Sequence, residues 1–426
     1  MNIYEAAKKA REASIILQAV ESDAKRKALE SIKEALEAHQ EAIFKANQVD
    51  IEMSEAQNVS MPVLKRLRFD KAKLQDVLDG IESLVHMKEP VGKVQMQTEL
   101  DEGLILTRVS CPIGVIGVIF ESRPDALVQI SSLCLKSGNA VLLKGGSEAK
   151  ETNKVLFEII KKASEEAGMP EGWITLMETR EEVSEILKMN KEIDLLIPRG
   201  SNEFVQYIMR NSDIPVMGHA DGICHTYVDE HADLDLAVKV VTDSKTQYVS
   251  VCNALETLLV HEKVANDFLP RLKESLESKG ATIKGCAKTR AIIECEEATE
   301  EDWQTEYLDY ILSIKIVSSL EEAICHINTY GSGHTDCIVS TDEEAVQKFM
   351  MLVDSGNVFC NVSTRFSDGF RYGFGAEVGV STSKIHARGP VGIEGLLIYK
   401  YKLLGHGHIV GDYASGVRKF THKKLV

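Results

Sequence analysis

The chain has 426 residues, a length that predicts two or three domains. Its hydrophobic fraction of 44% and charged fraction of 27% are typical of a folded protein with a sizeable core, and they exclude a disordered chain. The formal net charge of -16 argues against nucleic acid or an anionic membrane as a partner, so an anionic substrate would require a local cluster of positive charge.

The cysteines and the apolar runs indicate in which cellular compartment the protein is expected. Nine cysteines are scattered along the chain without a CxxC pair, which predicts neither a metal site nor a disulfide framework. There is no signal-peptide pattern, and no apolar run reaches the roughly 18 residues that a membrane span requires. We therefore expect a cytoplasmic protein without a bound metal.

The first half of the chain predicts helices followed by an α/β domain. Helical spacing dominates the first 86 residues and is clearest over 74–85, with Asp70 as the predicted N-cap. An extended hairpin is predicted over 93–109, and strands and helices then alternate as in a doubly wound parallel sheet. The strands cover 113–119, 140–144 and 193–197; the helices cover 124–137, ended by Gly138, 148–167, and a segment that opens at Ser201.

A second alternating series begins near Asp233 and predicts a second α/β domain. Its strands cover 256–260, 311–317 and 337–340, and its helices cover a segment near 233, 262–278, 319–328 and 342–353. Residues 294–309 contain eight acids and no Lys or Arg, which predicts a solvated surface. Residues 355–416 carry twelve of the 29 glycines and are typical of loops, which commonly hold functional residues.

Two segments are candidates for chemistry. No GxGxxG fingerprint follows the first strands, but a helix N-terminus can still hold a phosphate, which makes Gly200 and Ser201 candidate cofactor-binding residues. A plain helix cap is the alternative. Cys252 follows a polar stretch and precedes a predicted buried strand, a placement that would expose its thiol at a strand edge. A small, buried structural cysteine is the alternative there.

The residues around Cys252 carry a resemblance to a known family. KTQYVSVCNALETLLVH at 245–261 resembles the active-site region of the aldehyde dehydrogenase superfamily, and specifically its γ-glutamyl phosphate reductase family. Three further stretches agree in order: 120–124, 330–335 and 361–396. The resemblance implies an aldehyde dehydrogenase-like α/β fold with two doubly wound domains, one cofactor-binding and one catalytic, plus a small β oligomerisation element.

The resemblance also implies domain limits. The N-terminal helices and the dinucleotide-binding domain would cover 1–225, and a catalytic domain bearing Cys252 would cover 226–365. Residues 366–426 would return to the cofactor domain and supply an oligomerisation segment. The oligomerisation element would combine the hairpin at 93–109 with a strand near 396–404.

The implied reaction is the NADPH-dependent reduction of γ-glutamyl phosphate to glutamate 5-semialdehyde and phosphate, the second step of proline biosynthesis, through a thioester on Cys252. The Cys252 backbone N–H would help to hold the oxyanion. Ser122 stands where the superfamily has an asparagine as the second donor; Asn253 is another candidate, or only a cap. Lys245 is a candidate cation beside the thiol and the substrate, or a solvated surface lysine.

The superfamily's hydrolytic members carry a glutamate base in a motif that matches 218–222, where this chain has none. That absence favours a reductase, because an activated water would waste the thioester. His219 could replace the base, although a structural histidine is the alternative. A hydrolytic NAD(P)-dependent aldehyde dehydrogenase and a catalytically dead binding relative are the competing functions.

The remaining implied residues bind the cofactor and the substrate. Lys144 and Ser147 would meet the adenosine ribose and favour NADPH, because no acid stands at 147 to repel a 2′-phosphate. Glu306 would bind the nicotinamide ribose, or is one more surface acid. The candidate substrate residues are Glu121, Arg123, Lys245, Ser363, Thr364 and Arg365. The last three lie in a net positive stretch at 361–390. The implied partners are a small acyl phosphate, glutamate 5-kinase, and a second copy or copies in a homodimer or homotetramer.

Overall fold

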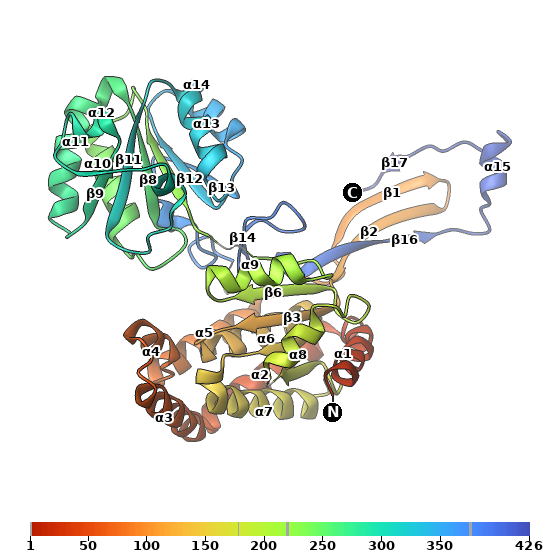
Figure 1. Ribbon diagram of the computed structural model, residues 1–426. Helices are drawn as coiled ribbons and strands as arrows, with labels where there is room; N and C mark the ends of the chain where they lie inside the picture. Colours follow the sequence, from red (N-terminus) through yellow and green to blue (C-terminus); the bar gives the residue numbers. More distant parts are fainter. Residues whose placement is uncertain (1, 178, 219–220, 375–376) are drawn as a thin grey trace. The chain divides into compact units, whose positions relative to one another are not determined.

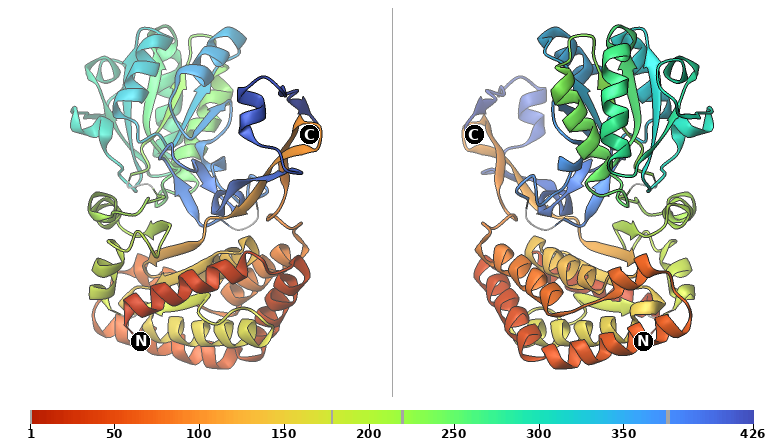
Figure 2. Two further views of the ribbon diagram at one scale, coloured as in Figure 1. Left: turned by 90° about the vertical axis from the view of Figure 1, so that its right-hand side faces the viewer. Right: turned by 90° about the vertical axis from the view of Figure 1, so that its left-hand side faces the viewer.

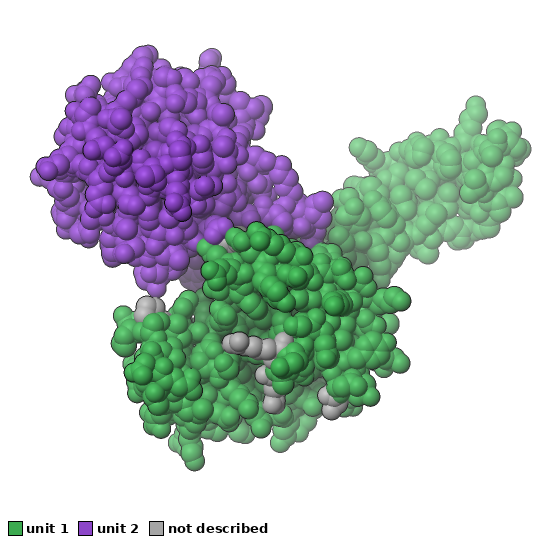
Figure 3. Space-filling model, in the orientation of Figure 1, with its two compact units in different colours: residues 1–217, 375–378, 391–426 green, residues 218–374, 379–390 purple. Residues whose placement is uncertain are grey.

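The computed structural model describes residues 2–177, 179–218, 221–374 and 377–426. The chain divides into two compact units, shown in green and purple in Figure 3. Unit 1 comprises residues 1–217, 375–378 and 391–426, and unit 2 comprises 218–374 and 379–390. These boundaries differ from the predicted limits at 225 and 365. Most of 366–390 belongs to unit 2, because side chains such as Asn253, which donates to the Ser367 carbonyl, hold it there.

Unit 1 begins with the predicted helices. They are α1 (Ile3–Leu17), α2 (Ser22–Ala38), α3 (Gln40–Ala56), α4 (Met61–Leu67) and α5 (Lys71–His86). Asp70 is the N-cap of α5 as predicted, because its carboxylate accepts a hydrogen bond from the Lys73 backbone N–H at 3.0 Å. Helix α2 packs against α5 and α7 (Lys150–Glu166), as the two views in Figure 2 let the reader follow.

A four-stranded parallel sheet forms the centre of unit 1, in the order β5-β4-β3-β6 (Figure 1). Its strands are β3 (Val115–Phe120), β4 (Ala140–Lys144), β5 (Ile174–Met177) and β6 (Leu195–Arg199). The helices between and after them are α6 (Pro124–Ser137), α7, α8 (Arg180–Ile186) and α9 (Asn202–Asn211), with a 3-10 turn at Ser147–Ala149. Gly138 ends α6 in the left-handed region at φ 76°, which confirms the predicted C-cap.

An antiparallel sheet adds strands from distant parts of the chain to unit 1. Its order is β16-β2-β1-β17, and its strands are β1 (Val94–Asp101), β2 (Leu104–Pro112), β16 (Leu397–Leu404) and β17 (Lys423–Lys424). The pairing of β16 with β2 confirms that the predicted hairpin and C-terminal strand combine. Whether this sheet joins subunits stays a prediction. Unit 1 also contains a 3-10 turn at Ile393–Leu396 and α15 (Val410–Ala414), whereas β14 (Gly379–Ser381) and the first two residues of β15 (Gly389–Val391) belong to unit 2.

Unit 2 is built on a seven-stranded parallel sheet in the order β10-β9-β11-β8-β7-β12-β13. The strands are β7 (Cys224–Val228), β8 (Leu255–His261), β9 (Thr282–Gly285), β10 (Glu296–Glu297), β11 (Ile311–Val317), β12 (Thr335–Val339) and β13 (Asn357–Cys360). The helices are α10 (Leu234–Thr246), α11 (Glu262–Glu277), α12 (Ala287–Arg290), α13 (Leu320–Tyr330) and α14 (Glu343–Leu352), with 3-10 turns at Glu301–Gln304 and Thr364–Phe366.

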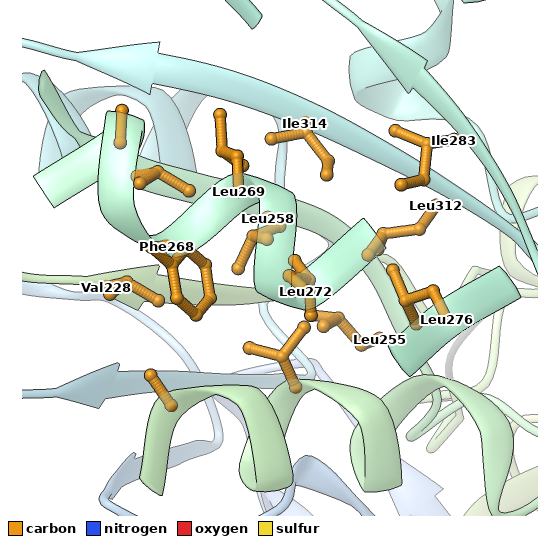
Figure 4. Close-up of a cluster of buried hydrophobic side chains, with 14 of the residues drawn as sticks. Val228, Leu255, Leu258, Phe268, Leu269, Leu272, Leu276, Ile283, Leu312 and Ile314 are labelled. Carbon is orange, nitrogen blue, oxygen red and sulfur yellow. The ribbon is translucent and has the colours of Figure 1, made fainter. Parts of the chain in front are cut away.

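Apolar side chains cover both faces of this second sheet. Figure 4 shows one cluster, in which Phe268 and Leu272 of α11 pack with Leu258 of β8. The next residue of β8, Leu259, belongs to another cluster with Phe349 of α14. Successive side chains of a strand point to opposite faces, so the sheet is covered by helices on both sides. The predicted doubly wound layout is confirmed here. No helix among the described residues is both long enough and apolar enough to cross a membrane.

The prediction of a solvated surface over 294–309 is wrong at its centre. Asp302 and Trp303 are buried, and Lys284 donates to the Asp302 carboxylate at 2.7 Å. Burial alone would raise the pKa of Asp302, but hydrogen bonds from Lys284, Thr299 and Tyr307 hold it below its usual value. Lys284 of β9, outside this acidic stretch, supplies the partner that residues 294–309 lack.

A buried histidine in unit 2 should make stability depend on pH. His326 is 4% exposed, and its Nδ1 accepts a hydrogen bond from the Lys315 ammonium at 3.2 Å. Burial, together with the charges of His225 and Lys315, lowers the pKa of His326 to about 3. The folded state therefore binds fewer protons than the unfolded state below the ordinary pKa of about 6.5, and stability is lost as the pH falls from there.

We expect this histidine to cost on the order of 3 kcal/mol of unfolding free energy between pH 7 and pH 4. His326→Phe should flatten that part of the dependence, as measured by denaturant titrations at both pH values. His406→Gln, at an exposed histidine, is the matched control. An unchanged pH slope in His326→Phe would contradict the assignment.

Candidate active site

Cys252 lies in the loop between α10 and β8, at the amino end of that strand. It is half-buried, whereas Cys134, Cys224 and Cys337 are buried and burial raises the pKa of each of their thiols. The backbone folds into a turn at the cysteine, where the Ala254 N–H donates to the Val251 carbonyl. The predicted placement of Cys252 before a buried strand is confirmed, so the loop can present the sulfur to a substrate.

Two neighbours fix the Cys252 backbone. The Cys224 thiol donates to the Cys252 carbonyl at 3.2 Å. Gly222 packs so closely that a Cβ at that position would lie 2.2 Å from the Cys252 oxygen and 2.3 Å from its Cα. No side chain fits there without moving the Cys252 loop.

Gly222→Ala should therefore displace the Cys252 loop. We expect iodoacetamide to alkylate Cys252 at least about tenfold more slowly, because the methyl group meets backbone rather than a flexible side chain. Alkylation of the tryptic peptide, followed by mass spectrometry, measures this. Gly80→Ala is the control, because a Cβ there meets nothing within 4 Å. An alkylation rate equal to that of the wild type would show that the loop accommodates the methyl group.

The segment 363–367 is tied to the cysteine loop. The Thr364 hydroxyl donates to the Asn253 carbonyl at 2.8 Å, and the Asn253 side-chain amide donates to the Ser367 carbonyl at 2.7 Å. The Ser363 hydroxyl accepts from Ser244 at 3.2 Å. The structure thus brings together Cys252 and three predicted site residues. The Asn253 amide already donates to the Ser367 carbonyl, and its role as an oxyanion donor stays an untested prediction.

Arg365 supplies a cation to the surroundings of the thiol. It is 8% exposed, and its Nε donates to the Gln247 side chain at 2.9 Å. Burial and the nearby Arg371 lower the pKa of Arg365, while the charges of Cys252 and Asp368 oppose that shift. A guanidinium remains charged at physiological pH, so Arg365 is a buried positive charge in the segment that is hydrogen-bonded to the Cys252 loop.

Lys245 has a different place from the solvated surface lysine that the sequence left open. Its side chain is fully buried, and its ammonium lies 2.6 Å from the carboxylate of Glu256, which is also fully buried. Burial lowers the pKa of Lys245 and raises that of Glu256 to about 7, and each shift is opposed by the partner's charge. The predicted contact of Lys245 with substrate is not visible in this arrangement and stays a prediction.

The other cations of the net positive stretch are paired. Lys384 and Arg388 both contact Asp354, at 2.5 and 2.9 Å. Arg371 donates to the Arg365 carbonyl at 2.7 Å. Surface pairing, which the sequence left open, therefore holds for Lys384 and Arg388, and Arg365 is the buried cation of this region.

The predicted cofactor residues after β4 lie in unit 1. Lys144 is the last residue of β4 and is buried, and its ammonium donates to the Gly145 carbonyl at 2.5 Å. The two glycines that follow pack tightly against side chains, because a Cβ on either would lie 2.1 Å from Asn153 or Glu148. Ser147 is exposed and opens the 3-10 turn. The end of β4 is thus a tightly packed turn with a buried lysine before it and an exposed serine after it.

Two carboxylates of unit 1 accept hydrogen bonds from groups that were predicted to donate to a ligand. Glu148 accepts from the Ser122 N–H at 2.6 Å and from its hydroxyl at 2.7 Å. Glu121 accepts from the Ser201 N–H at 3.2 Å, and a Cβ on Gly200 would lie 2.7 Å from the same carboxylate. Phosphate binding at the N-terminus of α9, or oxyanion binding by Ser122, would require these carboxylates to move. Both roles stay predictions.

The remaining predicted residues are placed as follows. Arg123 is half-exposed to solvent and lies 3.6 Å from Asp125 in the first turn of α6. Glu306 is half-buried in unit 2, and its charge contributes to the raised pKa of Glu256. His219 lies outside the described residues.

Sequence reasoning missed the polar residues that hold the site together. They are Ser244, Gln247 and Glu256 in unit 2, and Glu148 in unit 1. Glu256 had a readable signal, because an acid within an otherwise apolar strand needs a buried cation as partner. Ser244 and Gln247 have none, since their partners Ser363 and Arg365 lie far away in the sequence.

Comparison with known proteins identifies the family to which the chain belongs. The model of the Aldehyde dehydrogenase family matches residues 1–283. A γ-glutamyl phosphate reductase from Acetivibrio thermocellus is 64% identical over 100% of this chain and 99% of its own length. The chain belongs to the γ-glutamyl phosphate reductase family.

Further relatives agree with this family membership. A γ-glutamyl phosphate reductase from Pelotomaculum thermopropionicum is 62% identical over 100% of this chain and 98% of its own. The crystal structure of the γ-glutamyl phosphate reductase from Thermotoga maritima matches with a TM-score of 0.94 and 40% identity, covering 96% of this chain and 100% of its own. An acetylating aldehyde dehydrogenase from Geobacillus thermoglucosidasius shares the fold at a TM-score of 0.66 and 19% identity, covering 96% and 97%. The family confirms the predicted aldehyde dehydrogenase-like α/β fold, and its enzymes are oxidoreductases that use nicotinamide cofactors.

Proposed function

We propose that this enzyme reduces γ-glutamyl phosphate to glutamate 5-semialdehyde with NADPH, through a thioester on Cys252, in proline biosynthesis. The observation that carries the proposal is the half-buried Cys252 in a loop that hydrogen bonds join to the segment bearing the buried Arg365. The names of the full-length relatives support the substrate.

The acylation step follows from this geometry. The Cys252 thiolate attacks the acyl carbon, the bond to the phosphate oxygen breaks, and inorganic phosphate leaves. The Arg365 guanidinium neutralises the phosphate as it departs. The Cys252 backbone N–H stabilises the tetrahedral oxyanion, a contribution of roughly 3–4 kcal/mol in comparable sites.

The exposed Ser147 after β4 and the buried Lys144 before it support a place for the nucleotide at this end of the strand. Lys144 and Ser147 would hold the adenosine ribose and its 2′-phosphate, and Glu306 would hold the nicotinamide ribose. NADPH supplies the hydride that the acyl group receives when the nucleotide is bound. The thiohemiacetal on Cys252 then collapses to the aldehyde and restores the thiolate.

Protection of the thioester from water supports a reductase over a hydrolytic aldehyde dehydrogenase. Residues 218–222 contain no glutamate to activate a water. The two activities separate cleanly in the oxidative direction, because only the phosphorylating enzyme needs phosphate to release the acyl group.

The test is oxidation of glutamate 5-semialdehyde by NADP⁺ with and without phosphate. We expect turnover only with phosphate, and an acyl adduct on the Cys252 peptide by mass spectrometry when phosphate is omitted. Turnover without phosphate would replace this proposal by the hydrolytic activity. An adduct on another residue would overturn the mechanism.

We propose in addition that the enzyme is cytoplasmic and assembles as a closed symmetric dimer or tetramer. The exposed apolar side chains of β16, among them Tyr401 and Leu403, support an interface there. Its labile substrate makes glutamate 5-kinase the expected supplier. Light scattering after size exclusion measures the assembly, and a monomer at micromolar concentration would contradict it.

A further inference from the structure

The loop that carries Cys252 is closed at its base by the buried ion pair of Lys245 and Glu256. Lys245 lies in the last turn of α10, before the loop, and Glu256 is the second residue of β8, after it. Their charged atoms are 2.6 Å apart, and both side chains are 0% exposed. The pair therefore brackets the nucleophile within one unit.

The same carboxylate reaches a second functional segment. The other oxygen of Glu256 accepts a hydrogen bond from the Leu308 N–H at 3.3 Å, and Leu308 has left-handed backbone at φ 53°. Leu308 is two residues after Glu306. A further link is Ser313, whose hydroxyl donates to the backbone carbonyls of Glu256 and Asp302 at 3.1 and 3.3 Å. Glu256 thus joins the cysteine loop to the segment that bears Glu306.

Stability alone does not account for this pair. A buried ion pair loses the hydration of both charges, and apolar residues of similar size often serve a protein as well or better. What apolar residues cannot supply is an acceptor for the Leu308 N–H. Lys245 compensates the charge that Glu256 brings into the sheet.

We propose that Glu256, neutralised by Lys245, is a positioning residue that fixes the Glu306 segment relative to the Cys252 loop. The inference rests on the proposed function, in which Cys252 carries the acyl group and Glu306 contacts the nucleotide ribose. Glu256 contacts neither ligand itself. It fixes the position of Glu306, which is proposed to contact the nucleotide, relative to Cys252, which is proposed to carry the acyl group.

Two matched double variants isolate the acceptor. Lys245→Met/Glu256→Gln removes both charges but keeps a carbonyl oxygen for Leu308, whereas Lys245→Met/Glu256→Met removes the acceptor with little change in size. Lys348→Met/Glu321→Gln, at an exposed pair between α13 and α14, is the control for removing an ion pair. If the Met variant does not fold, Lys245→Met/Glu256→Leu replaces it.

The readouts separate nucleotide binding from thiol reactivity. Isothermal titration calorimetry with NADP⁺ should give a dissociation constant about tenfold higher for the Met variant than for the Gln variant. Iodoacetamide should alkylate Cys252 at rates within about twofold in both, and the control should match the wild type in both measurements.

Equal NADP⁺ affinity in the two variants would overturn the inference. So would a parallel loss of alkylation in the Met variant, because the pair would then serve the folding of the cysteine loop. A wild-type protein that binds NADP⁺ but oxidises the semialdehyde without phosphate would refute the proposed function and leave the affinity comparison valid. Failure of the wild type to bind NADP⁺ would overturn both.

Discussion

Cys252→Ala is expected to lower phosphate-dependent NADP⁺ reduction by roughly 10⁵-fold or more, because the sulfur that is proposed to carry the acyl chain is removed. Nucleotide binding should persist, since the thiol forms no predicted contact with the ribose or the phosphates. Steady-state assays with glutamate 5-semialdehyde measure the first effect, and calorimetry with NADP⁺ measures the second.

The control for Cys252→Ala is Cys325→Ala, at an exposed cysteine of α13. It should leave the activity within about twofold of the wild type, as surface substitutions usually do. Activity that survives in Cys252→Ala would refute the thioester. Activity lost equally in both variants would assign the effect to general thiol damage instead.

Arg365→Met should lower kcat/KM for the acyl phosphate by about a hundredfold, or about 3 kcal/mol. Methionine retains much of the buried apolar volume but removes the cation that is proposed to receive the phosphate. The bond to Gln247 is lost as well. Assays in the oxidative direction should also show a higher KM for phosphate, which a purely structural role would not produce.

Arg388→Gln is the matched control for Arg365→Met. Arg388 lies in the same net positive stretch but pairs with Asp354, which Lys384 also contacts. We expect its KM for phosphate to stay within about twofold of the wild type. Equal losses in the two variants would mean that overall charge, rather than the position of Arg365, governs phosphate binding.

The sequence predicted elements well where periodicity and local capping decide the structure. The strand over 140–144, the helix over 124–137 and its glycine cap are found as expected. Each is set by neighbours within a few residues, so one sequence contains the whole signal. The order of strands in the second sheet was not predicted, because it depends on pairing between strands far apart in the chain.

The candidate site was predictable only as far as the resemblance reached. It indicated Cys252 and the 363–365 segment, which the structure joins through Ser244 and Asn253. The sequence offered two alternatives for Lys245, a cation beside the substrate and a solvated surface lysine. The structure excludes the surface residue, because Lys245 is buried against Glu256, eleven positions later in the sequence, and the contact with substrate stays a prediction. Such pairs depend on strand and helix packing, which spacing alone does not reveal.

The edge position of β16 has a consequence for solubility. Only β2 is hydrogen-bonded to it within the described chain, so its other edge presents unpaired backbone groups to any extended peptide. Lys400 and Lys402 stand at alternate positions along this edge, among exposed tyrosines and leucines. Their charges discourage indiscriminate strand pairing at this edge, so the exposed strand does not promote aggregation.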